Sequence, residues 1–473
     1  MAEEPDIIYS NTPSLINLSF GKNVFSFYDQ NETGTKAGIQ VIKGDGTEVL
    51  GTFETYPNPV GYYHFDLQNL LKNYTTPNYD AETYSTKLFT ADDESYAFKV
   101  RYGWVNQATG QFNIQGTYPG TGQTQNCFVY GGVKEYWDLE WNNQSDYIIG
   151  LSGLLGCPVV YNKQLALTDW TIKKDIDKLT GGVPSWIPGT DTFVYNLQKR
   201  EQDELILSFI TKADKNISFP PPTGCDGIKA VRITFYDGDT ETYDVWWDNT
   251  IINGGGEVNA LNTDRNWLYP YNAISVPLGR RNFLNPYNFG FTHFYVATYT
   301  YYGGGLCSAQ DTYYSNTPTS YVYRVDNVID ECNDFAPVQL SWLNSKGFRD
   351  YFYFSKRTDE SINIVKNNYE RIEGTWGSDT FEVPTYSRGN TTFSQELTKK
   401  RTINTRYLSD EEAQYLKYLF ISPDVRVRYN NETNWIPITI TDTRWTERTF
   451  RKDKFFQYTI NYDEAHKINS QRG

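Results

Sequence analysis

The chain has 473 residues and a formal net charge of −14. At ~100–200 residues per domain, this length predicts roughly two to four domains, each with a core of its own. Aromatic residues make up 16 % of the chain, whereas the only methionine is Met1. Because aromatic side chains suit the half-buried surface of a sheet and methionine fills irregular gaps in helical cores, this composition indicates a β-rich fold.

The charge is unevenly distributed along the chain. Residues 346–473 carry 21 Lys and Arg against 18 Asp and Glu, which is +3; subtraction from 43 and 57 leaves 22 against 39, or −17, for the preceding residues. An acidic body argues against nucleic-acid binding, which requires basic residues that neutralise phosphates. The asymmetry favours head-to-tail contact between copies, and a simple need for net charge in solution is the alternative.

Cysteine spacing and hydropathy restrict the kinds of protein that this chain can be. The five cysteines form no C-x-x-C pair, so we expect neither zinc nor a disulfide framework but buried thiols in a reducing compartment. Residues 1–20 contain three acidic side chains and no basic start before an apolar core, so no secretory signal is expected. The longest apolar stretch, residues 147–160, is shorter than the ~18 residues of a membrane span, and we expect a soluble protein without membrane insertion.

Short strands separated by turns predict a β-sandwich domain over residues 1–145. Residues 39–50 form two strand-like runs around Asp45-Gly46, a pair that suits a hairpin turn because both positions adopt positive φ with little strain. Residues 96–104 and 111–115 predict another strand pair. This spacing of short strands is typical of a small sandwich.

Residues 146–335 repeat this pattern and predict a second β-rich domain that includes a connector. A hairpin around Asp237-Gly238 lies 192 residues after the first (237 minus 45), and 294–296 follow it as 98–100 follow the first hairpin. These offsets favour a duplicated sandwich, with chance similarity as the alternative. The proline run at 219–224 is interpreted as a rigid connector rather than a docking ligand for an aromatic groove.

Residues 336–473 predict a C-terminal α+β docking domain. A helix is expected to begin near Ser409, where Ser409 and Glu412 fit a capping box, and to end at Pro423. Residues 337–347 leading into 351–354 predict a strand, a turn and a second strand, and further strands are predicted at 425–429, 436–441 and 455–461. The fold class expected for the whole chain is therefore mainly β, with two Ig/fibronectin-like β-sandwich domains followed by this β-rich α+β domain.

A search for reactive groups finds little that indicates catalysis. The histidines, His64, His293 and His466, lie far apart, and H-E-x-x-H, G-x-S-x-G and GxxxxGK[ST] are absent. A Ser–His–Asp triad assembled in space stays open, but we expect surface or capping histidines. The carboxylates at 135–140 are interpreted as the solvent-exposed face of a strand rather than a glycosidase pair. Those at 237–244 are interpreted as a solvated hairpin edge rather than a calcium loop. We expect no enzyme activity, cofactor or metal.

Two features point to binding instead. Trp246 and Trp247 are adjacent on a predicted strand, so at most one of them faces a given surface; exposed aromatic residues favour a protein interface, with a glycan platform as the alternative. The candidate docking residues surround a predicted turn between the last two strands: Arg444, Arg448, Arg451, Lys452 and Lys454. The neighbouring Glu447 and Asp453 favour docking on an acidic protein over contact with nucleic acid.

Several segments resemble virion tail proteins of bacteriophages that infect Bacteroidetes, including crAss-like phages. They are QLSWLNSKGFRDYFYFSKR at 339–357, residues 407–425, QYTINYDEAHKINSQR at 457–472 and Tyr62–Leu67. The resemblance implies a structural virion protein that is assembled in the bacterial cytoplasm as a multi-copy ring, collar or tail-fibre platform. Its partners are then further copies of itself and other tail proteins. The acidic body is hypothesised to line a DNA channel, and a glycan-binding, receptor-recognition tail protein is the alternative function.

Overall fold

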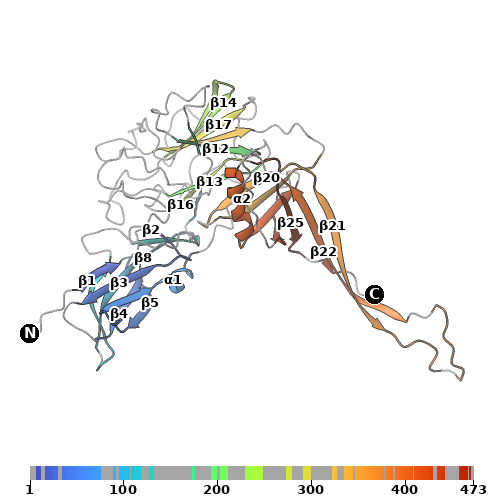
Figure 1. Ribbon diagram of the computed structural model, residues 1–473, viewed down its shortest axis with the longest axis horizontal. Helices are drawn as coiled ribbons and strands as arrows, with labels where there is room; N and C mark the ends of the chain where they lie inside the picture. Colours follow the sequence, from blue (N-terminus) through green and yellow to red (C-terminus); the bar gives the residue numbers. More distant parts are fainter. Residues whose placement is uncertain are drawn as a thin grey trace, which may run out of the picture. The chain divides into compact units, whose positions relative to one another are not determined.

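The computed structural model is mainly β, with several antiparallel sheets and two helices among the residues that it describes (Figure 1). The described residues are 7–11, 16–29, 35–75, 89–91, 95–106, 108–118, 127–132, 173–175, 193–199, 203–210, 230–248, 273–279, 291–299, 322–327, 335–344, 347–377, 379–386, 389–408, 410–429, 434–442, 457–466 and 468–469. The chain divides into two compact units. Unit 1 comprises Met1–Ile329 with Leu343–Tyr351, and unit 2 comprises Asp330–Trp342 with Phe352–Gly473. The division into three domains that the sequence suggests stays a prediction.

Unit 1 begins with two sheets that we call the first repeat. The smaller sheet has the order β1-β3-β6, and the larger has the order β2-β10-β8-β4-β5 with β9 paired to β8. The strands are β1 (Ile7–Asn11), β2 (Ile16–Leu18), β3 (Val24–Asp29), β4 (Ala37–Lys43), β5 (Val49–Thr55), β6 (Tyr62–Asp66), β8 (Ser95–Val105), β9 (Phe112–Tyr118) and β10 (Cys127–Tyr130), and helix α1 (Gln68–Leu71) follows β6.

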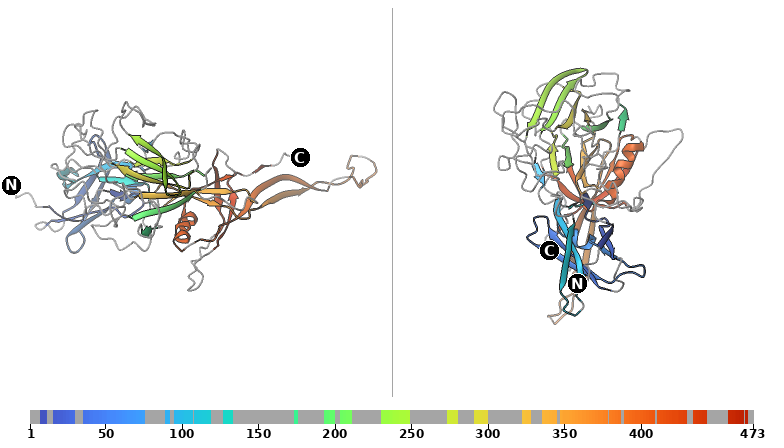
Figure 2. Two further views of the ribbon diagram at one scale, coloured as in Figure 1. Left: turned by 90° about the horizontal axis from the view of Figure 1, so that it is seen from above. Right: turned by 90° about the vertical axis from the view of Figure 1, so that its left-hand side faces the viewer.

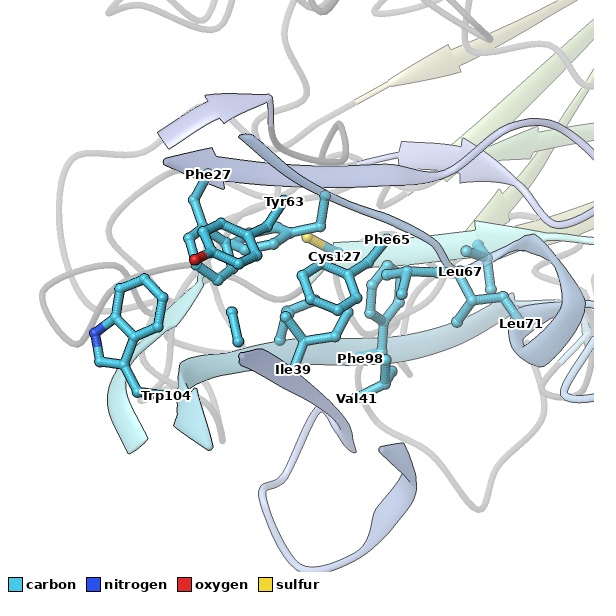
Figure 3. Packing of buried hydrophobic residues seen from close by; sticks show 14 residues of the cluster. Phe27, Ile39, Val41, Tyr63, Phe65, Leu67, Leu71, Phe98, Trp104 and Cys127 are labelled. Atoms are coloured by element: carbon cyan, nitrogen blue, oxygen red, sulfur yellow. The ribbon is translucent and has the colours of Figure 1, made fainter. Parts of the chain in front are cut away.

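A continuous aromatic and aliphatic core lies between these two sheets (Figure 3). Phe27 on β3 stacks on Tyr63 of β6 with ring centroids 5.3 Å apart, and Trp104 of β8 meets Tyr63 edge-on at 5.5 Å. Ile39 of β4 is fully buried against them. Core residues from β3, β4 and β8 therefore pack together between the two sheets.

The second repeat of unit 1 also has a large and a small sheet. Their orders are β11-β12-β18-β17-β14-β15 and β13-β16-β7. The strands are β7 (Phe89–Ala91), β11 (Lys173–Asp175), β12 (Phe193–Lys199), β13 (Ile206–Ile210), β14 (Ala230–Asp237), β15 (Thr240–Asp248), β16 (Ala273–Pro277), β17 (His293–Tyr299) and β18 (Val322–Asn327). Although β7 precedes β8 in sequence, it pairs with β16.

The same topology occurs in both repeats. Taken in chain order, β2, β3, β4, β5, β6, β8 and β10 correspond to β12, β13, β14, β15, β16, β17 and β18. In each repeat the first of these strands pairs in parallel with the last, and the other corresponding pairs are antiparallel. The recurrence that the two Asp-Gly hairpins indicated thus extends to seven strands.

Unit 2 is built on an eight-stranded sheet to which the β19–β20 hairpin contributes. The order is β20-β19-β23-β24-β25-β22-β21, with β26 paired to β22. The strands of this sheet are β19 (Val338–Leu343), β20 (Arg349–Phe354), β21 (Asp359–Glu370), β22 (Asn390–Asn404), β23 (Val425–Tyr429), β24 (Ile436–Ile440), β25 (Thr459–Glu464) and β26 (Ile468–Asn469), and helix α2 (Asp410–Ile421) precedes β23. The last residue of β19 and residues 349–351 of β20 are counted with unit 1. Trp342 of β19 is buried against Tyr415 of α2, with ring centroids 5.1 Å apart.

Several sequence predictions are confirmed by these elements. Gly46 and Gly238 have φ of +80° and +57° in the turns of the β4–β5 and β14–β15 hairpins. Helix α2 occupies the predicted position and buries Leu416 and Leu419. Cys127 is a free, buried thiol, and burial raises its pKa. The other four cysteines lie outside the described residues.

Candidate functional site

The most distinctive surface in the described part of the chain is a long hairpin, which we call the arm (residues 359–404). Its strands β21 and β22 are paired from Asp359 with Thr402 to Glu370 with Asn390. Within unit 2, β21 is the last strand of the sheet, and the pair runs past the other strands as a two-stranded ribbon (Figure 1, Figure 2). Every residue of β21 is exposed.

Apolar side chains occupy both faces of the arm. Paired residues of an antiparallel ribbon share a face, so Ile364 lies on one face with its partner Leu397. Tyr369 lies on the opposite face, where its ring meets Phe393 edge-on with centroids 6.2 Å apart. The register shift between Asn367 and Asn368 opposes two residues of β22 to one of β21 and brings Phe393 to that face.

The described residues of the tip of the arm (371–377, 379–386 and 389) form a folded loop rather than a bare turn. Thr375 donates its backbone N–H to the Glu382 carbonyl at 3.1 Å and its hydroxyl to the Thr380 carbonyl at 3.2 Å. The Trp376 indole donates to the Glu373 carbonyl at 2.8 Å and stands edge-on to Phe381, with centroids 5.1 Å apart. These contacts hold large apolar rings in fixed, solvent-facing positions.

Gly374 is required for this tip conformation. Its φ is +95°, a backbone conformation that residues other than glycine rarely adopt. A Cβ at this position would lie 2.6 Å from the ring of Phe381. The glycine therefore allows the backbone to approach the ring and to turn at the same place.

A charged and aromatic cluster, which we call the anchor, fixes the base of the arm to the sheet of unit 2. Arg401 of β22 forms ion pairs with Glu360 of β21 at 2.7 Å and with Glu464 of β25 at 3.5 Å. Its guanidinium lies 4.0 Å from the centre of the Tyr429 ring on β23. The Tyr429 hydroxyl in turn lies 3.0 Å from the Tyr462 hydroxyl and donates to Glu464 at 3.3 Å.

The anchor is largely withdrawn from water. Burial raises the pKa of Tyr462 to about 12, and burial together with the neighbouring Tyr462 raises the pKa of Tyr429. Both phenols therefore remain neutral hydrogen-bonding groups at neutral pH. The anchor links four strands through one arginine, so the ribbon leaves the sheet from a rigid base.

The arm concentrates the exposed apolar surface of the described residues. Ten of the 18 large hydrophobic side chains that are exposed there lie between residues 362 and 393. Trp376 is 73 % exposed and Tyr386 is 87 % exposed. Single exposed hydrophobic residues are common on any protein, whereas such a concentration marks an interaction site.

The histidines do not assemble a catalytic group with one another. His64 Nδ1 lies 2.7 Å from the Ser26 hydroxyl, but Ser26 is fully buried and the other ring nitrogen lies 3.4 Å from the Asn58 amide rather than a carboxylate. His64 and His466 are exposed as expected. The expectation of a surface position is wrong for His293, which is buried on β17 between Tyr236 and Tyr295.

His293 sits in an aromatic environment that opposes its protonation. Its ring stacks on Tyr236 at 5.3 Å, and Nδ1 lies 3.0 Å from the Thr292 hydroxyl. Burial, assisted by the charge of Arg324, lowers the pKa of His293 to about 4. The ring is neutral at neutral pH and acts as a packing group of the sheet.

Some of the remaining residues that the sequence singles out lie outside the described residues, and others are exposed at a turn. The basic cluster Arg444, Arg448, Arg451, Lys452 and Lys454 and the carboxylates at 135–140 lie outside the described residues, as do the side chains of Trp246 and Trp247. Asp237, Asp239 and Glu241 are exposed around the β14–β15 turn, as expected of a solvated hairpin edge. Within the described ranges, no three His, Cys, Asp or Glu side chains converge on a metal-binding position.

Neither helix in the described segments has the length and hydrophobicity needed to cross a membrane. No protein-family model matches the chain, and no curated protein matches its sequence. Among solved structures, one from a study of host cell surface retention of a 1.5-MDa bacterial ice-binding adhesin is 9 % identical, with a TM-score of 0.16. That alignment covers 85 % of this chain and 93 % of the adhesin chain.

Proposed function

We propose that this chain is a non-enzymatic structural virion protein of a bacteriophage tail. It acts as a multi-copy subunit of a ring, collar or tail-fibre docking platform, and it assembles in the bacterial host cytoplasm. The observation that carries the proposal is the arm, a ribbon with exposed apolar side chains on both faces and at its tip. The resemblance of residues 339–357, 407–425 and 457–472 to phage tail proteins supports the same conclusion.

The physical argument rests on what a two-stranded ribbon needs. An isolated hairpin is only marginally stable in water, and half-exposed Ile364 and Tyr369 on opposite faces leave this one with apolar surface on both sides. A neighbouring protein that covers both faces would stabilise the ribbon and remove that surface from water. A multi-copy assembly supplies such neighbours on every subunit.

The repeated topology of unit 1 supports two Ig-like domains within this function. Each repeat pairs a three-stranded sheet with a sheet in which a parallel first and last strand flank the antiparallel ones. That layout resembles immunoglobulin-type sandwiches, whose two sheets hold a shared core. Rigid sandwiches suit a tail component that transmits load, and a gene duplication would account for the repeat.

Copy number in the virus particle tests the proposal. Particles of the phage whose genome encodes this chain are purified, and the chain is quantified by mass spectrometry against the major capsid protein. Several copies per particle are expected. Absence from purified particles, with the chain present in infected cells, would refute the virion assignment.

A glycan-binding tail protein that recognises a receptor is the second candidate. It is favoured by Trp376 and Tyr386, whose exposed aromatic faces at the tip provide stacking surfaces. Purified chain on a glycan array would then give a signal that Trp376→Ala abolishes. The structural role predicts no sugar signal, so the array separates the two functions.

A further inference from the structure

We infer that the arm docks onto a second copy of this chain and is the element that links copies in the assembly. This inference rests on the proposed multi-copy function and adds the residues and the partner. The strands have exposed apolar residues on opposite faces, the tip carries preorganised aromatic rings, and the anchor fixes the direction of the ribbon.

The exposed apolar area matches what a stable contact between copies requires. The ten exposed hydrophobic side chains of the arm are each about half to nine-tenths exposed. Five of the ten are aromatic. At ~150–250 Å² for a whole aromatic side chain and less for isoleucine and valine, the ten together expose on the order of 1,000 Å². Each partner of a standard interface buries ~800 Å², so one arm is sufficient for one contact.

The charge of the arm suits contact between copies of an acidic protein. Residues 359–404 contain six Lys and Arg and seven Asp and Glu, a net charge of −1, and the rest of the chain carries the other −13 of the total −14. The arm belongs to the mildly basic residues 346–473, whose net charge is +3, whereas the preceding residues carry −17. A second copy therefore offers an acidic surface of complementary charge, which favours it as the occupant.

The faces and tip of the arm, rather than its edge, form the contact. Among the described strands β21 has no neighbour on its outer side, but Lys366 lies midway along it and Asp359 and Glu370 lie at its ends. Charged residues at such positions oppose edge-to-edge strand pairing. The side chains above and below the ribbon are left to make the contact.

Preorganisation keeps the cost of docking low. The Trp376 and Thr375 hydrogen bonds fix the tip before binding, and the anchor holds the base through Arg401. Ordering of loops and side chains is a main cost of association. Because this order exists in the single chain, most of the apolar burial contributes directly to affinity.

The test compares two matched double variants of the full chain. Trp376→Asp with Tyr386→Asp changes two exposed residues of the tip, and Tyr56→Asp with Val60→Asp changes two residues of the first repeat that are 60 % and 77 % exposed. Both variants add the same charge. Self-association is measured by light scattering over a range of concentrations, and circular dichroism checks folding.

The tip variant is expected to weaken self-association by at least about 10-fold, which corresponds to about 1.4 kcal/mol, while the control variant retains wild-type association. A second variant joins Val365 to Glu396, which pair in the ribbon, through Asn-Gly and so removes residues 366–395 without disturbing the base. It should be monomeric. Cross-links from Lys366 in mixtures of isotopically labelled and unlabelled chain should join different copies.

A wild-type chain that stays monomeric at every concentration would overturn the inference, as would arm variants that associate as tightly as wild type. Cross-links from Lys366 that occur only within one copy would have the same consequence. These outcomes leave the virion assignment to be decided by copy number in particles. Absence from particles, by contrast, would refute the proposed function even if the arm links copies in solution.

Discussion

Replacing Arg401 with methionine removes the charge that joins the arm to its sheet while keeping an unbranched side chain of similar length. The guanidinium is mostly buried, with 18 % of the side chain exposed, and it contacts three strands besides its own. The substitution also leaves Glu464, whose side chain is 13 % exposed, without its cation. The perturbation therefore falls on the part of unit 2 that orients the arm.

The contacts of Arg401 allow a magnitude to be worked out. The ion pair with the more exposed Glu360 contributes about 0.5 kcal/mol after solvent screening. Removing the cation from the largely buried Glu464 costs about 1.5 kcal/mol, less than for a fully buried pair because the two groups are 3.5 Å apart and partly exposed. The contact with the Tyr429 ring contributes about 1 kcal/mol. We expect a loss of about 3 kcal/mol in the free energy of opening of β22 and β25.

Hydrogen exchange read by mass spectrometry measures this loss in the full chain, because it reports the local opening free energy of each peptide. Arg357→Met is the control, since Arg357 pairs with Asp359 at 2.9 Å but both side chains are more than half exposed. The control should change stability by less than about 0.5 kcal/mol. Equal effects of the two substitutions would refute the anchoring role of Arg401.

Other regions of the chain give three further predictions. Burial lowers the pKa of His293 to about 4 in the folded state, from about 6.5 in the unfolded state. As the pH falls, the unfolded state therefore binds a proton before the folded state does. The free energy of unfolding should be highest above pH 6.5 and fall by up to about 3 kcal/mol as the pH approaches 4. Denaturant titrations should show this slope in wild type and not in His293→Phe. Gly374→Ala should disorder the tip and raise amide hydrogen exchange there, because the new Cβ meets the ring of Phe381. An unchanged exchange rate would contradict the requirement for glycine at this position. Phe27→Ala should destabilise the first repeat by about 3–5 kcal/mol in exchange measurements, since the ring is fully buried, and a loss below 1 kcal/mol would contradict the packed core.

Local chemistry explains which parts of the fold were predictable. Asp45-Gly46 and Asp237-Gly238 identified two hairpins because glycine at positive φ is a local requirement of the turn. Helix α2 was predictable because its apolar positions recur at helical spacing and Pro423 follows its end. The strand pairings of the two repeats join residues far apart in sequence, so only the recurrence of landmarks gave a sign of the shared topology.

The arm was missed because its sequence lacks the usual sign of a half-buried strand. In β21 the segment Ile362–Val365 places apolar residues on both faces, and polar Asn367 and Asn368 interrupt the pattern. A strand with one buried face alternates apolar and polar residues, which this strand does not. The basic residues at 444–454, which the sequence favours as the docking site, lie outside the described residues. The signal available in the sequence was the spacing of Trp376, Phe381 and Tyr386 after Gly374 in an otherwise mostly polar segment.

Electron cryomicroscopy of the intact virus particle is the most direct test of the central claim that this chain is a multi-copy structural subunit. We predict repeated density for the chain around the tail axis, with the tip residues Trp376 and Tyr386 of each copy covered by a neighbouring copy. A tail reconstruction that contains no density for the chain would contradict the account. So would a single copy per tail whose arm is surrounded by solvent.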